Sequence, residues 1–161
     1  MDFVQVCAVL GAGIAMGVGA IGSAIGEGKI AMSTVESLGR QPNASSKLIR
    51  LMIIAQAVTE TAAIFALVVS LLLLFQDTSG ASSIKAYTYI AAGISIGFGA
   101  VGAGLGAGLP GSSAVEGVGK QPENSDVITI QMIIGQAVAQ TSTIFALTVA
   151  LILVTLDPQP G

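Results

Sequence analysis

The sequence predicts an all-α membrane protein whose four transmembrane helices form two tandem helical hairpins. Three observations lead to this fold class: the chain has little charge, it contains four long apolar segments, and its second half repeats its first. Only 9% of its 161 residues are charged and 53% are hydrophobic, whereas soluble domains carry about 25% charged residues. A soluble fold could not cover its surface with so little charge, so the composition indicates the membrane class.

Four segments are long enough to cross the hydrocarbon core of a bilayer, which takes about 20 apolar residues in a helix. They are Phe3–Thr34, Leu48–Phe75, Ala86–Ser113 and Val127–Leu156. Helices satisfy their own backbone hydrogen bonds in lipid, which makes them the expected structure. The first segment carries no charge from Phe3 to Gly26 and is longer than the apolar part of a signal peptide, which has about 7–15 residues. We therefore interpret it as a retained membrane helix.

The second half of the chain repeats the first at a constant offset, without an insertion. Glu36–Pro42 matches Glu116–Pro122, and Met52–Val58 matches Met132–Val138. Each copy contains two spans, so both copies have the same topology and should pack side by side about an axis along the membrane normal. We divide the chain into hairpin one (1–76), an extracytoplasmic linker (77–85) and hairpin two (86–161).

The distribution of basic residues predicts the orientation of the hairpins in the membrane. The loop regions carry most of the positive charge: Arg40, Lys47, Arg50 and Lys120. The positive-inside rule then places both hairpin loops in the cytoplasm and both termini on the extracytoplasmic side. The net charge of −3 offers no basic surface for nucleic acid.

Small residues mark the first and third spans. Glycines at matching positions recur in both, and small residues four apart allow membrane helices to approach closely. The second and fourth spans are rich in Leu, Ile and Val. We expect the first and third spans to form a tightly packed inner layer, as on the inner wall of a ring, and the other two to face lipid.

One carboxylate stands in the middle of a long run that has no other ionisable residue. Glu60 is the only ionisable residue between Leu51 and Gln76, and Gln140 occupies its position in the second copy. A carboxylate is costly in hydrocarbon and usually marks an ion or proton pathway. We therefore expect transport through hairpin one.

These features together resemble the c subunit, or proteolipid, of rotary ATP synthases. The resemblance rests on the glycine-rich first helix, the loop residues Arg40, Gln41 and Pro42, and the carboxylate at Glu60, and it covers almost the whole chain twice. It implies a homo-oligomeric rotor ring, alone or with other proteolipids, embedded in membrane lipids. It also implies a stator protein whose arginine releases the ion, and central-stalk proteins that dock at Arg40, Gln41 and Pro42.

The resemblance implies a membrane component that is not an enzyme on its own and has no covalent cofactor. A duplicated proteolipid with one carboxylate resembles the vacuolar and archaeal type, but those chains keep the acid in the last helix. The local motifs are closer to the F-type pattern. The class of the complex, and whether it makes or hydrolyses ATP, stay open.

In sodium-binding members of this family, oxygen ligands surround the ion. Carried over motif by motif, these are the carboxylates Glu60 and Glu27, the Val58 carbonyl and the Thr61 hydroxyl. Oxygen ligands of this kind suit a hard cation. Phe65 stands where many sodium members have a tyrosine, so H⁺ remains the alternative to the Na⁺ that we favour.

The resemblance also implies that each site lies between neighbouring hairpins. Val138 and Thr141 of a second hairpin would then complete the site of Glu60. The competing interpretation is that Thr141 bonds only to its own helix. Glu27 likewise has an alternative, as a helix-end acid paired with Lys29.

Hairpin two has lost both carboxyls of the expected pair. Gln140 stands at the position of Glu60, and Ala107 stands at the position of Glu27. Two close carboxyls are expected to share a proton, so their joint absence indicates that they act as one unit. We expect hairpin two to carry no ion.

Two other classes of membrane protein compete with this interpretation. A small multidrug transporter also uses a membrane glutamate, but it would place aromatic side chains around a cationic drug. Aromatic residues make up 4% of this chain, and none clusters near Glu60. A channel or a purely structural proteolipid has no need of a carboxylate in an apolar helix.

Overall fold

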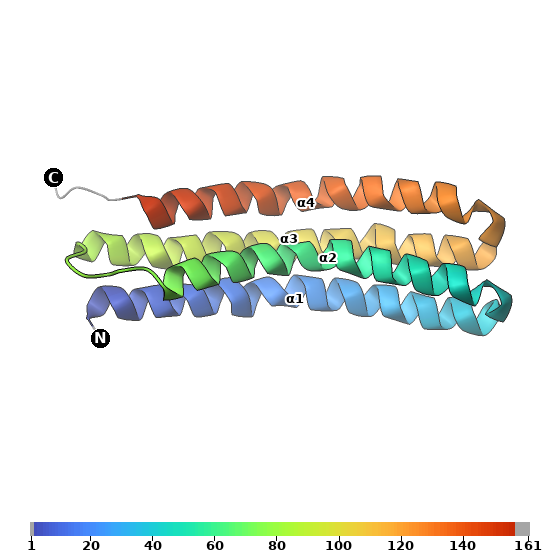
Figure 1. The fold of residues 1–161 in the computed structure, drawn as a ribbon, viewed down its shortest axis with the longest axis horizontal. Coiled ribbons are helices and arrows are strands. Elements are labelled where there is room, and N and C mark those ends of the chain that lie inside the picture. The colour runs from blue at the N-terminus through green and yellow to red at the C-terminus, as the bar shows by residue number, and fades with distance from the viewer. Residues whose placement is uncertain (1, 157–161) are drawn as a thin grey trace.

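The computed structural model describes residues 2–156, and it consists mainly of long helices that lie side by side (Figure 1). The helices are α1 (Phe3–Arg40), α2 (Ser45–Leu74), α3 (Ser83–Lys120) and α4 (Ser125–Thr155). Each is long and apolar enough to cross a membrane. The structure confirms the predicted fold class, an integral multi-pass protein of four helices.

One short turn joins the two helices of each hairpin, and the two turns are nearly identical. One-turn 3₁₀ segments, η1 (Pro42–Ala44) and η2 (Pro122–Asn124), follow directly on Gln41 and Gln121. The N–H of Gln41 caps α1 by donating to Ser37 O at 2.8 Å. A residue before proline is driven out of the helical region, and Gln41 accordingly has φ −138° and ψ 71°. The proline thus ends each long helix, as the sequence predicted.

The helices extend further than the predicted spans. Hydropathy ended the first span at Thr34 and the third at Ser113, but α1 continues to Arg40 and α3 to Lys120. Hydropathy detects only the part of a helix that lies in hydrocarbon. The extra turns of α1 and α3 carry polar residues, among them Glu36, Arg40, Glu116 and Lys120.

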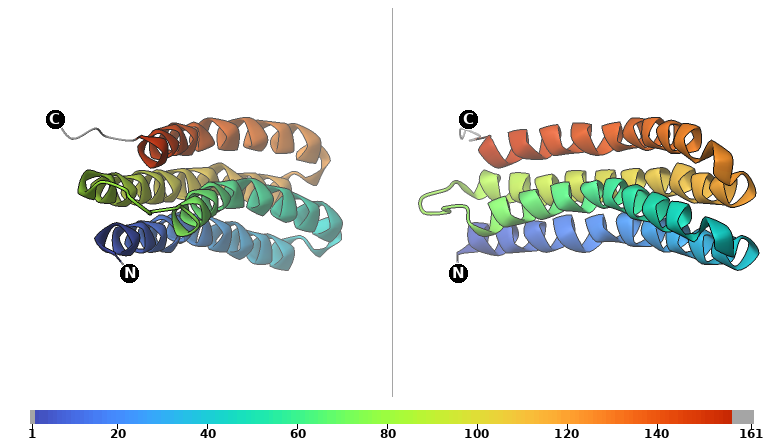
Figure 2. Two further views of the ribbon diagram at one scale, coloured as in Figure 1. Left: turned by 60° about the vertical axis from the view of Figure 1, so that its left-hand side comes forward. Right: turned by 45° about the vertical axis from the view of Figure 1, so that its right-hand side comes forward.

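Both hairpin turns lie at one end of the molecule, and the start of α1, the end of α4 and the α2–α3 connection lie at the other (Figures 1 and 2). This is the arrangement expected for two repeats of the same topology. In the connection, Asp77 Oδ1 accepts the N–H of Ser79 at 2.9 Å. Gly80 has φ 74°, a conformation that favours glycine.

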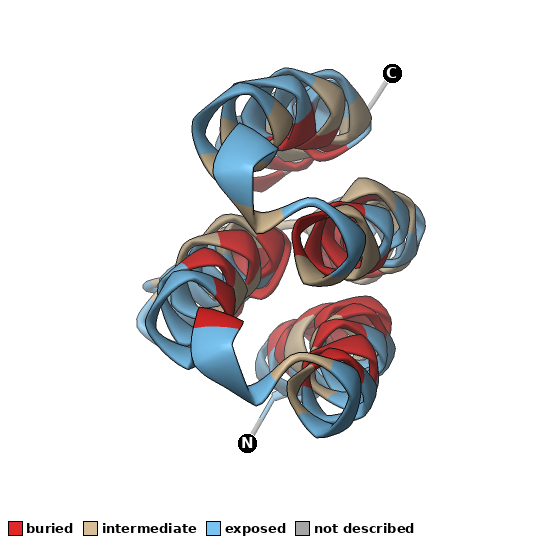
Figure 3. Ribbon diagram, turned by 90° about the vertical axis from the view of Figure 1, so that its right-hand side faces the viewer, coloured by how far each residue is buried: buried red, intermediate tan, exposed pale blue. Residues whose placement is uncertain are grey.

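Viewed along the bundle, α2 lies beside both α1 and α3, and α4 packs on the far side of α3 (Figure 3). The most extensive contact joins α1 and α3, while α4 contacts α3 and α2. Buried residues face the inside of the bundle, and the outer faces of α2 and α4 expose large aliphatic side chains. These faces fit the predicted lipid-facing layer.

The α1–α3 contact is built on glycine. A Cβ added at Gly22 would collide with the backbone of Val101, and one at Gly104 would collide with the backbone of Ser23. On other faces of the same helices, a Cβ at Gly13, Gly17 or Gly102 would meet nothing within 4 Å. A single chain therefore fills only part of its small-residue surface.

Candidate functional site

Hairpin one carries two carboxyl groups side by side inside its long helices. Glu27 lies in the interior of α1 and is half-buried, and Glu60 lies near the middle of α2 with an exposed side chain. Their carboxyl groups are within hydrogen-bonding and electrostatic reach of each other. Oε1 of Glu27 is buried and receives no hydrogen bond from the described residues. A pair of this kind is stabilised when a proton or a cation lies between the two groups.

The alternative for Glu27, a helix-end acid paired with Lys29, does not fit this placement. Glu27 lies well inside α1, which continues to Arg40. Within residues 2–156, the ion pair that forms joins Arg40 Nη1 to Glu36 Oε2 at 3.8 Å. The structure thus brings Glu27 to Glu60 rather than to Lys29.

In hairpin two, the position of Glu60 is filled by a buried amide. Gln140 is 7% exposed, and its Nε2 donates to the Val58 carbonyl of hairpin one at 2.9 Å. The Thr61 hydroxyl donates to the same carbonyl at 2.7 Å. Of the predicted ligand atoms, Val58 O therefore contacts Gln140 across the hairpins, and Thr61 Oγ1 bonds to the same carbonyl within α2. Ala107, which replaces Glu27, is fully buried and adds no polar group.

The remaining two predicted ligands lie on α4. Val138 is 67% exposed, and Thr141 is exposed as well. The Thr141 hydroxyl donates to Val138 O of its own helix at 2.7 Å, as the competing interpretation requires for a single chain. The prediction that Val138 and Thr141 complete the site of Glu60 refers to the Glu60 of a neighbouring copy, so it stays a prediction.

Two glutamines belong to the same region, although in the sequence they served only to reveal the repeat. Gln56 Nε2 donates to Glu27 O at 3.4 Å. Its counterpart Gln136 donates to the carbonyl of Ala107 at 3.1 Å, so both hairpins contain the same bond between outer and inner helix. Gln136 also reaches into hairpin one, where it donates to Ala55 O at 3.0 Å and Thr59 Oγ1 at 3.2 Å. The sequence signal that could have predicted these hydrogen bonds is a polar glutamine repeated at the same position of two apolar spans.

The loop residues predicted to dock a stalk lie at the turn of hairpin one. Arg40 ends α1, Gln41 caps it, and Pro42 begins η1. The Arg40 side chain is steadied by Glu36 and by Ser37 Oγ, to which it donates at 3.4 Å. This end of the molecule also holds the turn of hairpin two (Figure 1).

The family model for the C subunit of ATP synthase matches the chain twice, over residues 10–73 and 90–153. The chain belongs to this ATP synthase C-subunit family. Each match spans one hairpin, so the tandem duplication predicted from the sequence is a duplication of the family's own unit.

Individual members of the family are similar to about half of the chain. The ATP synthase c subunit of Petrotoga mobilis is 49% identical over 67 residues, which are 42% of this chain and 70% of that protein. An ATP synthase c subunit of Cereibacter sphaeroides is 44% identical over 76 residues, covering 47% of this chain and 92% of that protein. One from Pelobacter propionicus is 46% identical over 77 residues, covering 48% of this chain and 84% of that protein.

Proposed function

We propose that this chain is an ion-translocating rotor component of a rotary ATP synthase or ATPase and carries one Na⁺ per chain at Glu60. The observation that carries the proposal is the Glu27–Glu60 pair within membrane-spanning helices. Its counterpart in hairpin two consists of Ala107 and a hydrogen-bonded Gln140. The family membership supports the class of protein, and the carboxyl pair supports the binding of a cation at Glu60.

The internal repeat supports assembly of several copies into a ring. On α3, Gly93 and Gly97 pack against α1, whereas their counterparts on α1, Gly13 and Gly17, have open space. A second copy related by the same step as the two hairpins would place its α3 on this open face. Repeated head-to-tail contacts of this kind form a closed ring when the rotation closes.

The same step completes the site of Glu60. Inside the chain, the residue at this position in hairpin two, Gln140, meets the Val58 carbonyl of hairpin one. Shifted by one hairpin, Glu60 would meet the Val138 carbonyl of the next copy, with the Thr141 hydroxyl beside it. Glu60 and Glu27 of one copy and Val138 and Thr141 of the next then offer oxygen ligands to Na⁺.

Transport of H⁺ remains the alternative, because a carboxyl pair can hold a proton without further ligands. The two ions are distinguished by labelling Glu60 with a carbodiimide, which reacts with a protonated carboxyl. In a Na⁺ site, added NaCl at neutral pH protects Glu60, and equal KCl does not. Protection that depends on pH alone assigns H⁺. Failure of Glu60 to react under any condition, with another carboxyl of the chain reacting instead, contradicts the site itself.

The neighbouring proteins of the complex follow from the same proposal. A stator arginine would displace the ion from Glu60, and a central stalk would bind the exposed turn at Arg40, Gln41 and Pro42. Both hairpin turns would then lie in the cytoplasm. Cysteine substituted at Asn43 should react with a membrane-impermeant thiol reagent only from the cytoplasmic face of vesicles, and reaction only from the opposite face would reverse the orientation.

A further inference from the structure

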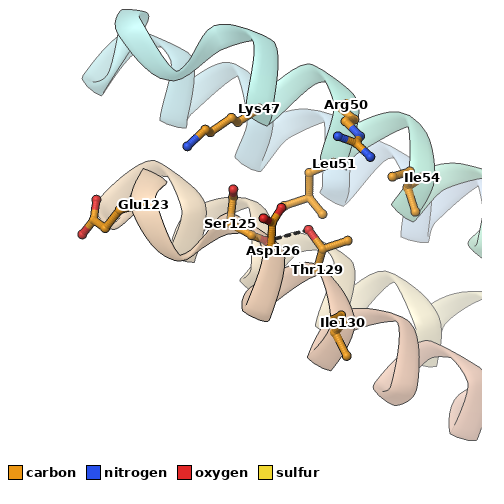
Figure 4. Close-up of a pocket in the computed structure, with 9 residues that line it drawn as sticks. All are labelled: Lys47, Arg50, Leu51, Ile54, Glu123, Ser125, Asp126, Thr129 and Ile130. Carbon is orange, nitrogen blue, oxygen red and sulfur yellow. Dashed lines mark hydrogen bonds between the residues drawn. The ribbon is translucent and has the colours of Figure 1, made fainter.

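A cavity of ≈ 390 Å³ opens between the loop ends of α2 and α4 (Figure 4). Small-molecule sites have volumes of about 300–1,000 Å³. The lining residues come from both hairpins: Lys47, Arg50, Leu51, Ile54, Glu123, Ser125, Asp126, Thr129 and Ile130. This cavity lies at the turn end of the molecule, away from Glu60.

The cavity has one basic wall and one acidic wall. Lys47 and Arg50 stand on α2, and Glu123 and Asp126 line the opposite side of the cavity from η2 and α4 (Figure 4). Lys47 Nζ donates to the carbonyl of Pro122 at 2.8 Å. Among residues 2–156, neither Arg50 nor Asp126 forms an ion pair. The two walls are complementary in charge, and the bond from Lys47 to the Pro122 carbonyl bridges them without an ion pair.

The internal repeat shows that these charges belong to this groove alone. The counterparts of Lys47 and Arg50 in hairpin two are Val127 and Ile130. The counterparts of Glu123 and Asp126 in hairpin one are Asn43 and Ser46. A groove formed between two copies by the same step would therefore lack all four charges.

The position of the cavity along the helices matches the headgroup region of a bilayer. Arg50 is the last charge on α2 before the uncharged run that leads to Glu60. Leu51 and Ile54, the next lining residues on α2, lie towards the hydrocarbon. Basic side chains at this level bind lipid phosphates, and an apolar strip below them can accommodate an acyl chain.

We propose that this cavity binds the headgroup of a phospholipid carrying both a phosphate and a primary ammonium, as in phosphatidylethanolamine. The phosphate accepts charge-assisted hydrogen bonds from Arg50 and Lys47. The ammonium has N–H donors for Asp126 and Glu123. A choline headgroup has no such donors, and a glycerol headgroup has no positive charge. The acyl chain lies against Ile54 and Ile130.

The test uses the full-length chain in its isolated assembly, exchanged into nanodiscs of phosphatidylcholine with equal minor fractions of phosphatidylethanolamine and phosphatidylglycerol. Lipids that remain after mild detergent washing are quantified per chain by mass spectrometry. We expect about one retained phosphatidylethanolamine per chain, enriched over the other two lipids. Arg50→Met and Asp126→Asn should each reduce this retention about tenfold, as the loss of one charge-assisted hydrogen bond predicts.

Ser46→Ala is the matched control, because Ser46 is the counterpart of Asp126 and lies outside the cavity lining; it should leave retention unchanged. Carbodiimide labelling of Glu60 should persist in all three variants, which verifies their fold and separates this proposal from that of the ion site. Equal retention of the three lipids overturns the proposal. So does unchanged retention in both Arg50→Met and Asp126→Asn, which would show that the retained lipid binds elsewhere on the assembly.

Discussion

At Gln140 an amide stands where hairpin one has a carboxylate, and its nitrogen lies 2.9 Å from the Val58 carbonyl. A buried carbonyl oxygen needs a donor or a cation, and the amide provides the donor permanently. At this contact between the two hairpins, the Gln140 amide therefore takes the place that a cation could occupy beside the Val58 carbonyl. Glu60, at the exposed edge of the chain, instead lies beside the carboxyl group of Glu27.

Replacing Gln140 by Glu should create a second ion site in each chain. A carboxylate buried against the Val58 carbonyl must take up a proton or a cation. Carbodiimide labelling followed by mass spectrometry should then show two modified carboxyls per chain, where the parent shows one. In the double variant Glu60→Gln/Gln140→Glu, the single remaining label should be at position 140. A folded Gln140→Glu protein that reacts only at Glu60 would refute the assignment.

Gln136 should contribute more to stability than its counterpart Gln56. Gln136 is fully buried and donates to Ala55 O, Thr59 Oγ1 and Ala107 O, whereas Gln56 makes one long bond at 3.4 Å. Gln136→Ala should lower the free energy of unfolding by about 1–3 kcal/mol, the cost of unsatisfied buried groups. Gln56→Ala should cost clearly less in the isolated chain. Unfolding in mixed detergent micelles measures both, and equal losses would contradict the structure.

At the scale of the helix, α1 and α3 each have one occupied and one open glycine face. Gly22 and Gly102 hold the same position in the two copies, but only Gly22 is covered, by the backbone of Val101. If copies assemble by the step that relates the hairpins, Gly102 is covered in turn by Ile21 of a neighbouring copy. The same helix position then serves folding in one hairpin and assembly in the other.

Alanine substitutions at these two glycines should separate folding from assembly. Gly22→Ala should destabilise the chain by about 1–3 kcal/mol, because the added methyl group overpacks a rigid backbone contact. Gly102→Ala should leave the stability of the single chain unchanged and weaken the oligomer. Unfolding in micelles reports the first effect, and native mass spectrometry of the assembly reports the second. An intact oligomer in Gly102→Ala would contradict the proposed face.

Most of the helical architecture could be predicted from the sequence, because a bilayer permits few kinds of backbone structure to cross it. The four spans, the repeat and the prolines that end α1 and α3 all follow from composition and local geometry. The helical turns beyond Thr34 could not be predicted, since hydropathy ignores helix outside the hydrocarbon. The bond from Gln140 to Val58 also escaped prediction, because it depends on how far one hairpin is displaced against the other. The charged cavity required the same information.

At the scale of the whole molecule, one carboxyl pair serves two hairpins. A ring of given circumference then carries half as many ions per turn as a ring with a site in every hairpin. The free energy of each hydrolysed ATP is divided among fewer ions, so each ion can be driven against a steeper gradient. In the opposite direction, each ion must contribute more to the synthesis of one ATP.

The complex should therefore work better as a pump than as a synthase. In proteoliposomes, ATP hydrolysis by the parent complex should build a steeper ion gradient than hydrolysis by the Gln140→Glu variant, whose two sites per chain divide the same free energy among more ions. The parent complex should synthesise ATP only under a large imposed gradient. Efficient ATP synthesis at a modest gradient would exclude this gearing.

The short connection between α2 and α3 restricts the number of hairpins that a ring of these chains can contain. Because one chain joins a hairpin that has the carboxyl pair to one that lacks it, a ring made only of these chains would contain an even number of hairpins. The two kinds alternate without error, whatever the order in which copies assemble. The chain itself therefore sets the angular step between successive carboxyl pairs in such a ring. A ring built from separate hairpins would need selective contacts between unlike hairpins to give the same alternation.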